Sequence, residues 1–190
     1  MLKPVLGIFI GGRGTRMGGV QKALLRAPGG AETLIARSVR VAREAGCEAV
    51  LLGTADLGDE ARGVLQLPDR ATDLGPLAGL ASLLDHAGDR PALCLACDMP
   101  YVSSALLARL VNEHVDASVL APRDIASGKW QPLCARYASA RVAPVLAAAM
   151  AEGVRSFQTL FGRISVTELP LTRAEHAQLR DWDKPEDIES

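Results

Sequence analysis

The sequence carries almost no net charge and lacks the features of an exported or membrane protein. Its formal net charge is −1 and its pI is near 6.3, so it has no general electrostatic attraction to nucleic acid or to an anionic membrane. Only Lys3 precedes the first apolar run, which glycines and an arginine soon interrupt, unlike a signal peptide or a membrane span. We therefore expect a cytoplasmic protein that binds neither nucleic acid nor membrane.

Cysteine and histidine are scarce as well. The chain has three histidines without ligand spacing and four cysteines, Cys47, Cys94, Cys97 and Cys134, which are too few and too scattered for a disulfide framework. Cys94 and Cys97 have the spacing of a redox or zinc pair, but no second pair exists and they lie in an apolar run that predicts a strand. Residues three apart in a strand point to opposite faces, so we predict buried structural cysteines.

Internal repeats and low-complexity linkers are absent too. The 190 residues are 48% hydrophobic and 23% charged, which is typical of a globular chain. That length suffices for one sizeable core. We therefore predict one domain over residues 1–190, in a monomer or a weak oligomer.

A glycine-rich segment follows the first apolar run and organises the rest of the chain. The run Val5–Ile10 has the pattern of a buried strand. Five glycines then occur among residues 11–19, including Gly11, Gly12 and Gly14, so the backbone can approach a ligand closely. Glycine N–H groups form an anion-binding nest, and Arg16 and Lys22 add charges that match phosphate oxygens. An ordinary solvent loop is the alternative to this phosphate-binding interpretation.

Spacing excludes two common phosphate-binding loops. A dinucleotide loop that starts at Gly12 would need glycine at position 17, which is Met17, and a P-loop would need lysine after Gly19, which Val20 follows. A dehydrogenase is disfavoured further by Gly53, because a dinucleotide fold places an acidic residue at the end of its second strand.

Alternating helix and strand patterns predict the fold class. A strand–helix–strand order implies a parallel sheet with right-handed crossovers, and we predict an α/β protein with three layers, α/β/α, around a mostly parallel sheet. Helices are expected at residues 32–45, 59–65, 77–86, 106–114, 142–150 and 156–161. Further strands are expected at residues 48–53, 91–96, 117–121, 130–137 and 164–169.

A lone carboxylate, Asp98, follows the strand expected at residues 91–96. Ligands of open α/β sheets bind outside the carboxyl ends of the strands. Asp98 and the glycine-rich segment should therefore meet at this edge of the sheet, which we call the rim. A carboxylate beside phosphates is a natural ligand for Mg²⁺. Asp98 could instead cap the next helix, but Ser103 and Ser104 are better placed as caps, and we predict that Asp98 binds the metal.

Other positions flank the same rim. Gly75 and Gly79 bracket a helix N-terminus that favours negative ligands and could approach a base or sugar closely, although a plain turn without a ligand fits nearly as well. Asp69, just beyond a strand-like segment, is ambiguous in the same way. Asp181 and Asp183 lie two residues apart in an extended tail; they are either solvated or near the metal.

These parts together indicate nucleotidyl transfer. The sequence shows no nucleophile–base pair, and none is needed if the attacking group is itself an ionised phosphate that the protein only has to align. Arg16 and Lys22 would stabilise charge on the transferring group, and a magnesium ion on Asp98 would help pyrophosphate leave.

Several motifs resemble the molybdenum cofactor guanylyltransferases, which are MobA-like NTP transferases of the Rossmann-like, nucleotide-diphospho-sugar transferase type. The similarity spans nearly the whole chain. The motifs are Gly-Gly-x-x-x-Arg-Met-Gly-Gly-x-x-Lys from Gly11, Gly75-Pro76-Leu77-Ala78-Gly79, Cys97-Asp98-Met99-Pro100-Tyr101, Gln131-Pro132-Leu133 and Pro185-Glu186-Asp187.

The resemblance implies transfer of GMP from magnesium-GTP to the phosphate of molybdenum-loaded molybdopterin, with other molybdenum cofactor biosynthesis proteins or apo-molybdoenzymes as partners. It places Phe9, Ile10, Gly11, Gly12 and Lys22 at the nucleotide, Asp69 near the guanosine and Asp98 at magnesium. The chain departs from the family's pattern at Phe9-Ile10, Gln21, Gly53 and the tail at residues 181–186. A cytidylyl- or sugar-phosphate nucleotidyltransferase, or a silent nucleotide-binding or cofactor-delivery module, is therefore the alternative.

Overall fold

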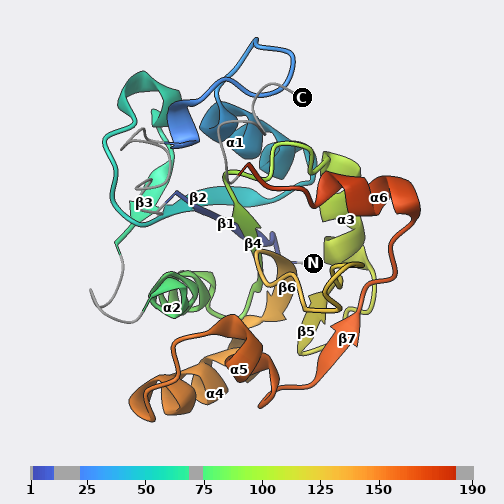
Figure 1. Cartoon of the computed structure of the whole chain (residues 1–190). Coiled ribbons are helices and arrows are strands. Elements are labelled where there is room, and N and C mark those ends of the chain that lie inside the picture. The colour runs from blue at the N-terminus through green and yellow to red at the C-terminus, as the bar shows by residue number, and fades with distance from the viewer. Residues whose placement is uncertain (1, 11–21, 69–74, 183–190) are drawn as a thin grey trace.

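A seven-stranded sheet forms the centre of the molecule (Figure 1). The structure is a computed structural model that describes residues 2–10, 22–68 and 75–182. Within these residues the strand order is β3-β2-β1-β4-β6-β5-β7. The strands are β1 Val5–Phe9, β2 Glu48–Leu52, β3 Leu65–Leu67, β4 Pro91–Ala96, β5 Val119–Ala121, β6 Cys134–Ala138 and β7 Val166–Glu168.

The sheet is mostly parallel, as the sequence predicts. Strand β1 lies between β2 and β4 and runs parallel to both. Only β6 is antiparallel to its neighbours β4 and β5. Strands β1, β2, β3 and β4 therefore end at the same edge of the sheet, where the sequence analysis places the ligand.

Helices cover both faces of the sheet, so the predicted three-layer arrangement is confirmed. Figure 1 shows α1, α3 and α6 on one side and α2, α4 and α5 on the other. The helices are α1 Leu34–Glu44, α2 Pro76–Ala87, α3 Ser104–Asn112, α4 Ser139–Ala151, α5 Phe157–Phe161 and α6 Arg173–Gln178, with short 3₁₀ turns η2 Lys22–Leu24 and η3 Gly58–Ala61.

Each face of the sheet has its own hydrophobic cluster, because side chains alternate along every strand. Leu6 and Ile8 of β1 join the cluster under α1 and α3, whereas Val5 joins the cluster under α2, α4 and α5. Cys97 belongs to the first cluster and Cys94 to the second. The two cysteines therefore lie on opposite sides of the sheet, and the prediction of buried structural cysteines is confirmed.

Glycine in the middle of β1 allows the helix layer to approach the sheet. A Cβ atom on Gly7 would lie 2.7 Å from Leu52 Cδ1 and 2.8 Å from Leu83 Cδ2, closer than van der Waals contact allows. The side chains of α2 and β2 fill the space above Gly7, which explains a glycine at a position where it otherwise weakens a strand.

Most predicted elements are present, but two predictions were wrong in part and one helix was missed. The helix expected at residues 59–65 is the short η3, and Leu65 begins β3 because residues 65–67 pair with the open edge of β2. The strand expected at residues 130–137 begins only at Cys134, because Trp130 instead forms an isolated bridge with Arg123. The helix α6 was not predicted, since none of its six residues is buried and it lacks an apolar stripe.

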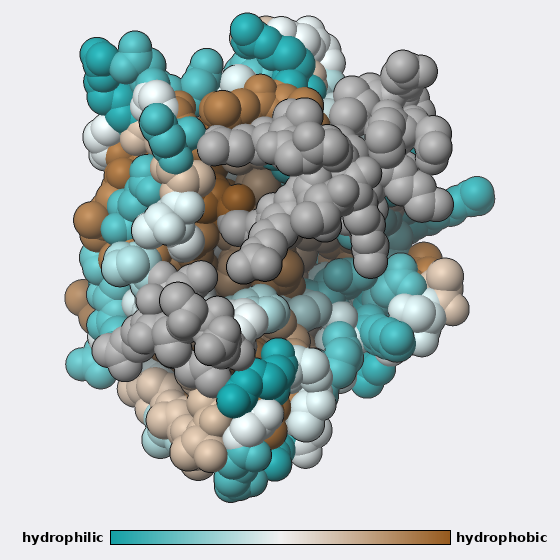
Figure 2. Space-filling model, turned by 60° about the vertical axis from the view of Figure 1, so that its left-hand side comes forward, coloured by the Kyte–Doolittle hydropathy of each residue, from teal (hydrophilic) through white to brown (hydrophobic). Residues whose placement is uncertain are grey.

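In the view of Figure 2, hydrophilic residues occupy much of the outline, whereas apolar residues are visible towards the middle and at the left-hand edge. No helix in the described part of the chain combines the length and the apolarity that crossing a bilayer requires.

Candidate functional site

The carboxyl edge of the sheet is tied together by backbone hydrogen bonds that extend past the strands. Ile10 N donates to Leu52 O over 3.2 Å, and Gly53 N donates to Leu67 O over 3.0 Å. Cys97 N donates to Phe9 O over 3.1 Å. The residue that follows β1 and the turn that carries Asp98 are therefore held side by side.

Lys22 and Asp98 form an ion pair at this edge, although 76 residues separate them. Lys22 Nζ lies 3.1 Å from Asp98 Oδ2, and their side chains are 18% and 22% exposed. Partial burial reduces the screening of this pair by solvent. The two charged residues that the sequence analysis places at one rim thus lie in direct contact.

A compact turn carries Lys22. Its carbonyl accepts a hydrogen bond from Leu25 N over 3.0 Å, and Leu25 O accepts one from Leu34 N over 2.9 Å at the start of α1. Thr33 caps α1 by accepting from Ala36 N, and its hydroxyl donates to Glu60 over 2.9 Å. Lys22 is therefore fixed to the N-terminus of α1 and, through it, to η3.

Asp98 does not cap the next helix. That role belongs to Ser103, whose hydroxyl accepts from Leu106 N over 3.2 Å, as the sequence analysis predicts. The Asp98 carbonyl accepts instead from Trp182 N over 2.9 Å. The carboxylate faces Lys22 while the backbone of Asp98 is held by the C-terminal part of the chain.

Phe9 and Gly79 contact each other across the rim. A Cβ atom on Gly79 would lie 2.8 Å from Phe9 Cε1, and the Phe9 ring packs edge-on against Phe157 with a centroid distance of 6.4 Å. The absence of a side chain at Gly79 therefore has a packing reason that is independent of any ligand.

Gly75 is the N-cap of α2 with φ of 60° and ψ of −152°, and Pro76 occupies the first turn as predicted. The left-handed φ favours glycine at this position. Ile10 is partly buried and packs on the cluster under α1 and α3. The other predicted residues, Gly11, Gly12, Gly14, Arg16, Asp69 and Asp183, lie outside the described part of the chain.

The thiol of Cys97, next to Asp98 in the chain, has low reactivity. Burial, with a smaller effect from the negative charge of Asp98, raises the pKa of Cys97 to about 12. A thiol with such a pKa is protonated at neutral pH and is therefore a poor nucleophile.

Comparison with known proteins decides the family of this chain. Residues 7–165 match the family model described as the MobA-like NTP transferase domain. The chain belongs to this family. Similar proteins are the molybdenum cofactor guanylyltransferase of Pseudomonas entomophila, 35% identical over 94% of this chain and 93% of the relative, and that of Xanthomonas euvesicatoria, 33% identical over 97% and 92%.

Solved structures of other nucleotidyltransferases share the fold. The molybdopterin-guanine dinucleotide biosynthesis protein A of Archaeoglobus fulgidus superposes with a TM-score of 0.77 at 22% identity, over 97% of this chain and 94% of that protein. The 2-C-methyl-D-erythritol 4-phosphate cytidylyltransferase of Thermus thermophilus superposes with a TM-score of 0.70 at 18% identity, over 96% and 94%. These identities establish the fold alone.

The residues of this MobA-like NTP transferase are compatible with a magnesium ion that substrate phosphates help to hold. Within residues 2–10, 22–68 and 75–182, no three His, Cys, Asp or Glu side chains lie close enough to form a metal site. Mg²⁺ commonly keeps several waters and uses one or two carboxylates together with phosphate oxygens. Asp98, a carboxylate at the rim, suits that mode of binding.

Sequence analysis of this MobA-like NTP transferase missed an aromatic cluster beside Asp98. Tyr101 and Trp182 pack edge-on with a centroid distance of 6.4 Å, and the Arg180 guanidinium lies 5.0 Å from the centre of the Tyr101 ring. One signal was available, because the chain has only seven aromatic residues and Tyr101 lies in one of the motifs of the rim. The contact itself depends on how the chain returns after β7.

Proposed function

We propose that this protein transfers GMP from magnesium-GTP to the phosphate of molybdenum-loaded molybdopterin. Membership of the MobA-like NTP transferase family makes the chain a nucleotidyltransferase. Relatives named molybdenum cofactor guanylyltransferase, similar over more than nine-tenths of the chain, support GTP and the pterin as substrates. The observation that carries the proposal is the contact of Lys22 with Asp98 at the carboxyl edge of the sheet.

The reaction needs alignment more than proton transfer. An oxygen of the pterin phosphate forms a bond with the α-phosphorus of GTP, and the bond from that phosphorus to the oxygen bridging to the β-phosphate breaks. Pyrophosphate leaves, and the product joins GMP and the pterin through a new phosphoanhydride. The attacking phosphate is already ionised at neutral pH, so no side chain has to act as a general base.

The chain's own residues orient the triphosphate and neutralise its charge. Lys22 extends its ammonium group into the rim and would meet phosphate oxygens there, with Arg16 adding a second cation. The backbone of Gly11, Gly12 and Gly14 would supply N–H donors. Phe9, Ile10 and Gly79 would border the nucleoside, and Gly75 would present the N-terminus of α2 to negative charge. Asp69 would lie near the guanosine.

Asp98 would hold the metal ion. A bound Mg²⁺ would supply Lewis-acid stabilisation of the negative charge that develops on the leaving pyrophosphate. The Lys22 ammonium lies beside the same carboxylate and would restrain its orientation. For Asp181 and Asp183 both alternatives stay open, a solvated tail or additional groups near the ion.

A pyrophosphate-release assay tests the proposal. Magnesium and molybdenum-loaded molybdopterin are supplied with GTP, CTP or ATP in separate reactions. We expect turnover with GTP only, and none without magnesium or without the pterin. Turnover with CTP alone would show that the protein is a cytidylyltransferase instead. Absence of turnover with every nucleotide would make the acceptor wrong, and sugar phosphates or a silent binding role would take its place.

Partners and location complete the proposal. We expect the protein to act in the cytoplasm as a monomer or weak oligomer, and to exchange the pterin with other molybdenum cofactor biosynthesis proteins or with apo-molybdoenzymes. Size-exclusion chromatography with light scattering reads the oligomeric state directly, and a tight, obligate oligomer would contradict this part.

A further inference from the structure

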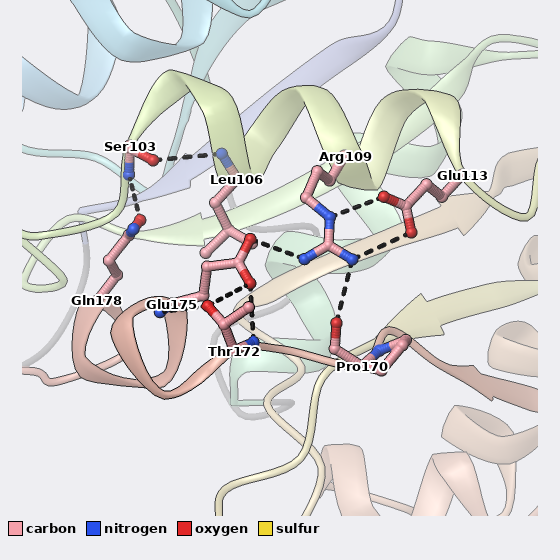
Figure 3. Close-up of polar contacts among 8 residues, drawn as sticks. All are labelled: Ser103, Leu106, Arg109, Glu113, Pro170, Thr172, Glu175 and Gln178. Atoms are coloured by element: carbon pink, nitrogen blue, oxygen red, sulfur yellow. Dashed lines mark hydrogen bonds and ion pairs between the residues drawn. The ribbon is translucent and has the colours of Figure 1, made fainter.

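The chain beyond β7 crosses α3, and the last described residue, Trp182, lies beside Asp98. We call residues 170–182 the C-terminal strap. Its central part is α6, none of whose residues is buried, so polar contacts rather than apolar packing hold this helix. Figure 3 shows these contacts, which join α6 and the residues before it to one face of α3.

Arg109 of α3 is the main attachment point of the strap. Its Nη1 donates to Glu175 Oε1 over 2.7 Å, and its Nη2 donates to Pro170 O over 3.1 Å. Glu113, one turn further along α3, accepts from Nε over 2.7 Å and keeps the guanidinium in place. Hydrogen bonds from the Thr172 N–H and from Arg109 lower the pKa of Glu175 to about 2, so the carboxylate is charged at neutral pH and this ion pair is formed.

A second attachment lies at the other end of α6. Ser103 N at the start of α3 donates to Gln178 Oε1 over 3.0 Å. The next residue, Leu179, is 8% exposed and packs on the cluster under α1 and α3. The strap is thus held at Pro170, Glu175, Gln178 and Leu179 before it reaches the rim.

Trp182 is the residue that the strap places at the rim. Its side chain is 2% exposed and packs with Ala27 and Leu34. Its Nε1 donates to the Tyr101 hydroxyl over 3.4 Å. Trp182 is therefore the most deeply buried residue of a segment that is otherwise held largely by polar contacts.

The contacts of Trp182 reach both partners of the ion pair. Its backbone N–H holds the carbonyl of Asp98. Its ring packs on Ala27, which follows the turn of Lys22, and on Leu34, the first residue of α1, whose N–H donates to Leu25 O of that turn. One residue therefore bridges the two separate segments from which the proposed phosphate and metal groups project.

We propose that Trp182 is a positioning residue for the Lys22–Asp98 pair. The C-terminal strap, through the contacts of Arg109 and Gln178, holds Trp182 in its buried position. Trp182 touches neither reacting group in this assignment and acts through the backbone of Asp98 and the turn of Lys22. The inference rests on the proposed function, because it concerns how the rim is aligned for nucleotidyl transfer.

Substitution of Trp182 tests the positioning role. Trp182→Ala removes the ring but leaves the backbone N–H, and we expect kcat to fall about 100-fold, as small misplacements of reacting groups do. The Mg²⁺ concentration that gives half-maximal rate should rise, and KM for GTP should change less than kcat. Trp182→Phe keeps an aromatic ring in this buried position and should restore most of the rate. Trp130→Phe is the matched control for loss of an indole elsewhere.

A purely structural role predicts a different result. In that case Trp182→Ala would lower the thermal midpoint while folded protein kept the wild-type kcat and Mg²⁺ dependence, and this outcome would overturn the inference. If Trp182→Ala does not fold, Arg109→Met and Gln178→Leu serve in its place. Both leave Trp182 intact, and both should lower kcat and raise the Mg²⁺ requirement by smaller factors. If Arg109→Met and Gln178→Leu fold and keep the wild-type kcat and Mg²⁺ requirement, the strap has no role in holding Trp182.

Fluorescence tests the strap without any substrate. In a Trp130→Phe background Trp182 is the sole tryptophan, and acrylamide should quench it weakly because the side chain is 2% exposed. Arg109→Met and Gln178→Leu should increase quenching severalfold. Gln178→Glu keeps the oxygen that accepts from Ser103 N, and Arg163→Met removes an exposed ion pair with Glu152 elsewhere; neither should change quenching. Unchanged quenching in the first two variants would contradict the strap's role.

The two proposals fail in distinguishable ways. If wild-type protein turns over no nucleotide, the proposed function is wrong, whatever the fluorescence shows. If wild-type protein is active and the Trp182 and strap variants match it in kcat and Mg²⁺ dependence, the inference alone is wrong.

Discussion

Asp98 has two roles in the described structure, one through its side chain and one through its backbone. The carboxylate contacts Lys22, and the carbonyl accepts from Trp182 N. A substitution that changes only the charge of the side chain separates these roles, because the backbone contact does not depend on the side chain.

Asp98→Asn should therefore abolish magnesium-dependent turnover while the protein stays folded. We expect a loss of about 100-fold or more, the size seen when one electrostatic group of a transition state is removed, with a urea midpoint close to that of the wild type. Asp59→Asn is the matched control, since Asp59 is an exposed carboxylate paired with Arg62 at 2.5 Å. Full activity of Asp98→Asn would refute the metal assignment.

Substitution of Gly79 by alanine tests whether the rim is tightly packed around Phe9. Alanine in a helix interior is favoured over glycine by about 1 kcal/mol, but overpacking costs about 1–3 kcal/mol, and the new methyl group would lie 2.8 Å from Phe9 Cε1. We expect Gly79→Ala to lower the free energy of unfolding by about 1 kcal/mol in urea titrations. In a Phe9→Leu background the same change should be neutral or stabilising; a stabilising effect with Phe9 present would show that the ring moves freely.

Helix α4 contains a proline that its local sequence does not favour. Pro144 is the sixth residue of α4, where it has no N–H to donate to the carbonyl of Ala140. Both residues are exposed, so water can reach that carbonyl, and the helix continues because Val142, Leu146 and Ala149 are buried against the sheet. Tertiary packing overrides local preference in this element.

Pro144→Ala should consequently stabilise the protein. Proline destabilises a helix interior by about 3 kcal/mol relative to alanine. It also lowers the conformational entropy of the unfolded chain, which offsets about 1 kcal/mol of that loss. We expect the free energy of unfolding to rise by about 2 kcal/mol, measured by urea denaturation monitored by circular dichroism. Activity should be unchanged because α4 does not contribute a residue to the proposed site. A lower stability would mean that α4 is distorted around Pro144 in a way that alanine does not reproduce.

Burial of the four cysteines is a property of the whole molecule. Two lie in strands, Cys94 in β4 and Cys134 in β6, and Cys47 and Cys97 lie in connections between elements, yet each is less than 9% exposed. Burial raises the pKa of Cys47 to about 11 and that of Cys134 to about 12. Reactivity of a thiol depends on its thiolate form and its exposure, so the folded protein should be resistant to alkylation.

Thiol titration measures this protection. At pH 8 we expect folded protein to react slowly at all four cysteines with a soluble thiol reagent, and unfolded protein in guanidinium to react rapidly at all four. The sign follows from the raised pKa values, because pH 8 lies below each of them and the thiols remain protonated. Rapid modification of one cysteine in the folded state would locate a part of the core that opens without global unfolding.

Sequence and tertiary structure contributed differently to this protein. Apolar runs, glycine turns and capping serines were sufficient to predict the parallel α/β fold, the rim, and the positions of Lys22 and Asp98 on it, because these signals are local and the ends of parallel strands converge by geometry. The predicted roles of the glycine-rich segment and of Asp69 stay predictions, since they lie outside the described residues.

Only the tertiary structure decided which distant segments meet. Local pattern could not reveal the pairing of Leu65–Leu67 with β2, the packing of Gly79 on Phe9, or the return of Trp182 to Asp98. Each of these contacts is between residues far apart in the chain, and α6 is held by polar side chains that leave no hydrophobic period. The amino-acid sequence determined the elements and the chemical groups, whereas long-range packing set their geometry, because such contacts form only when the whole sheet and both helix layers are in place.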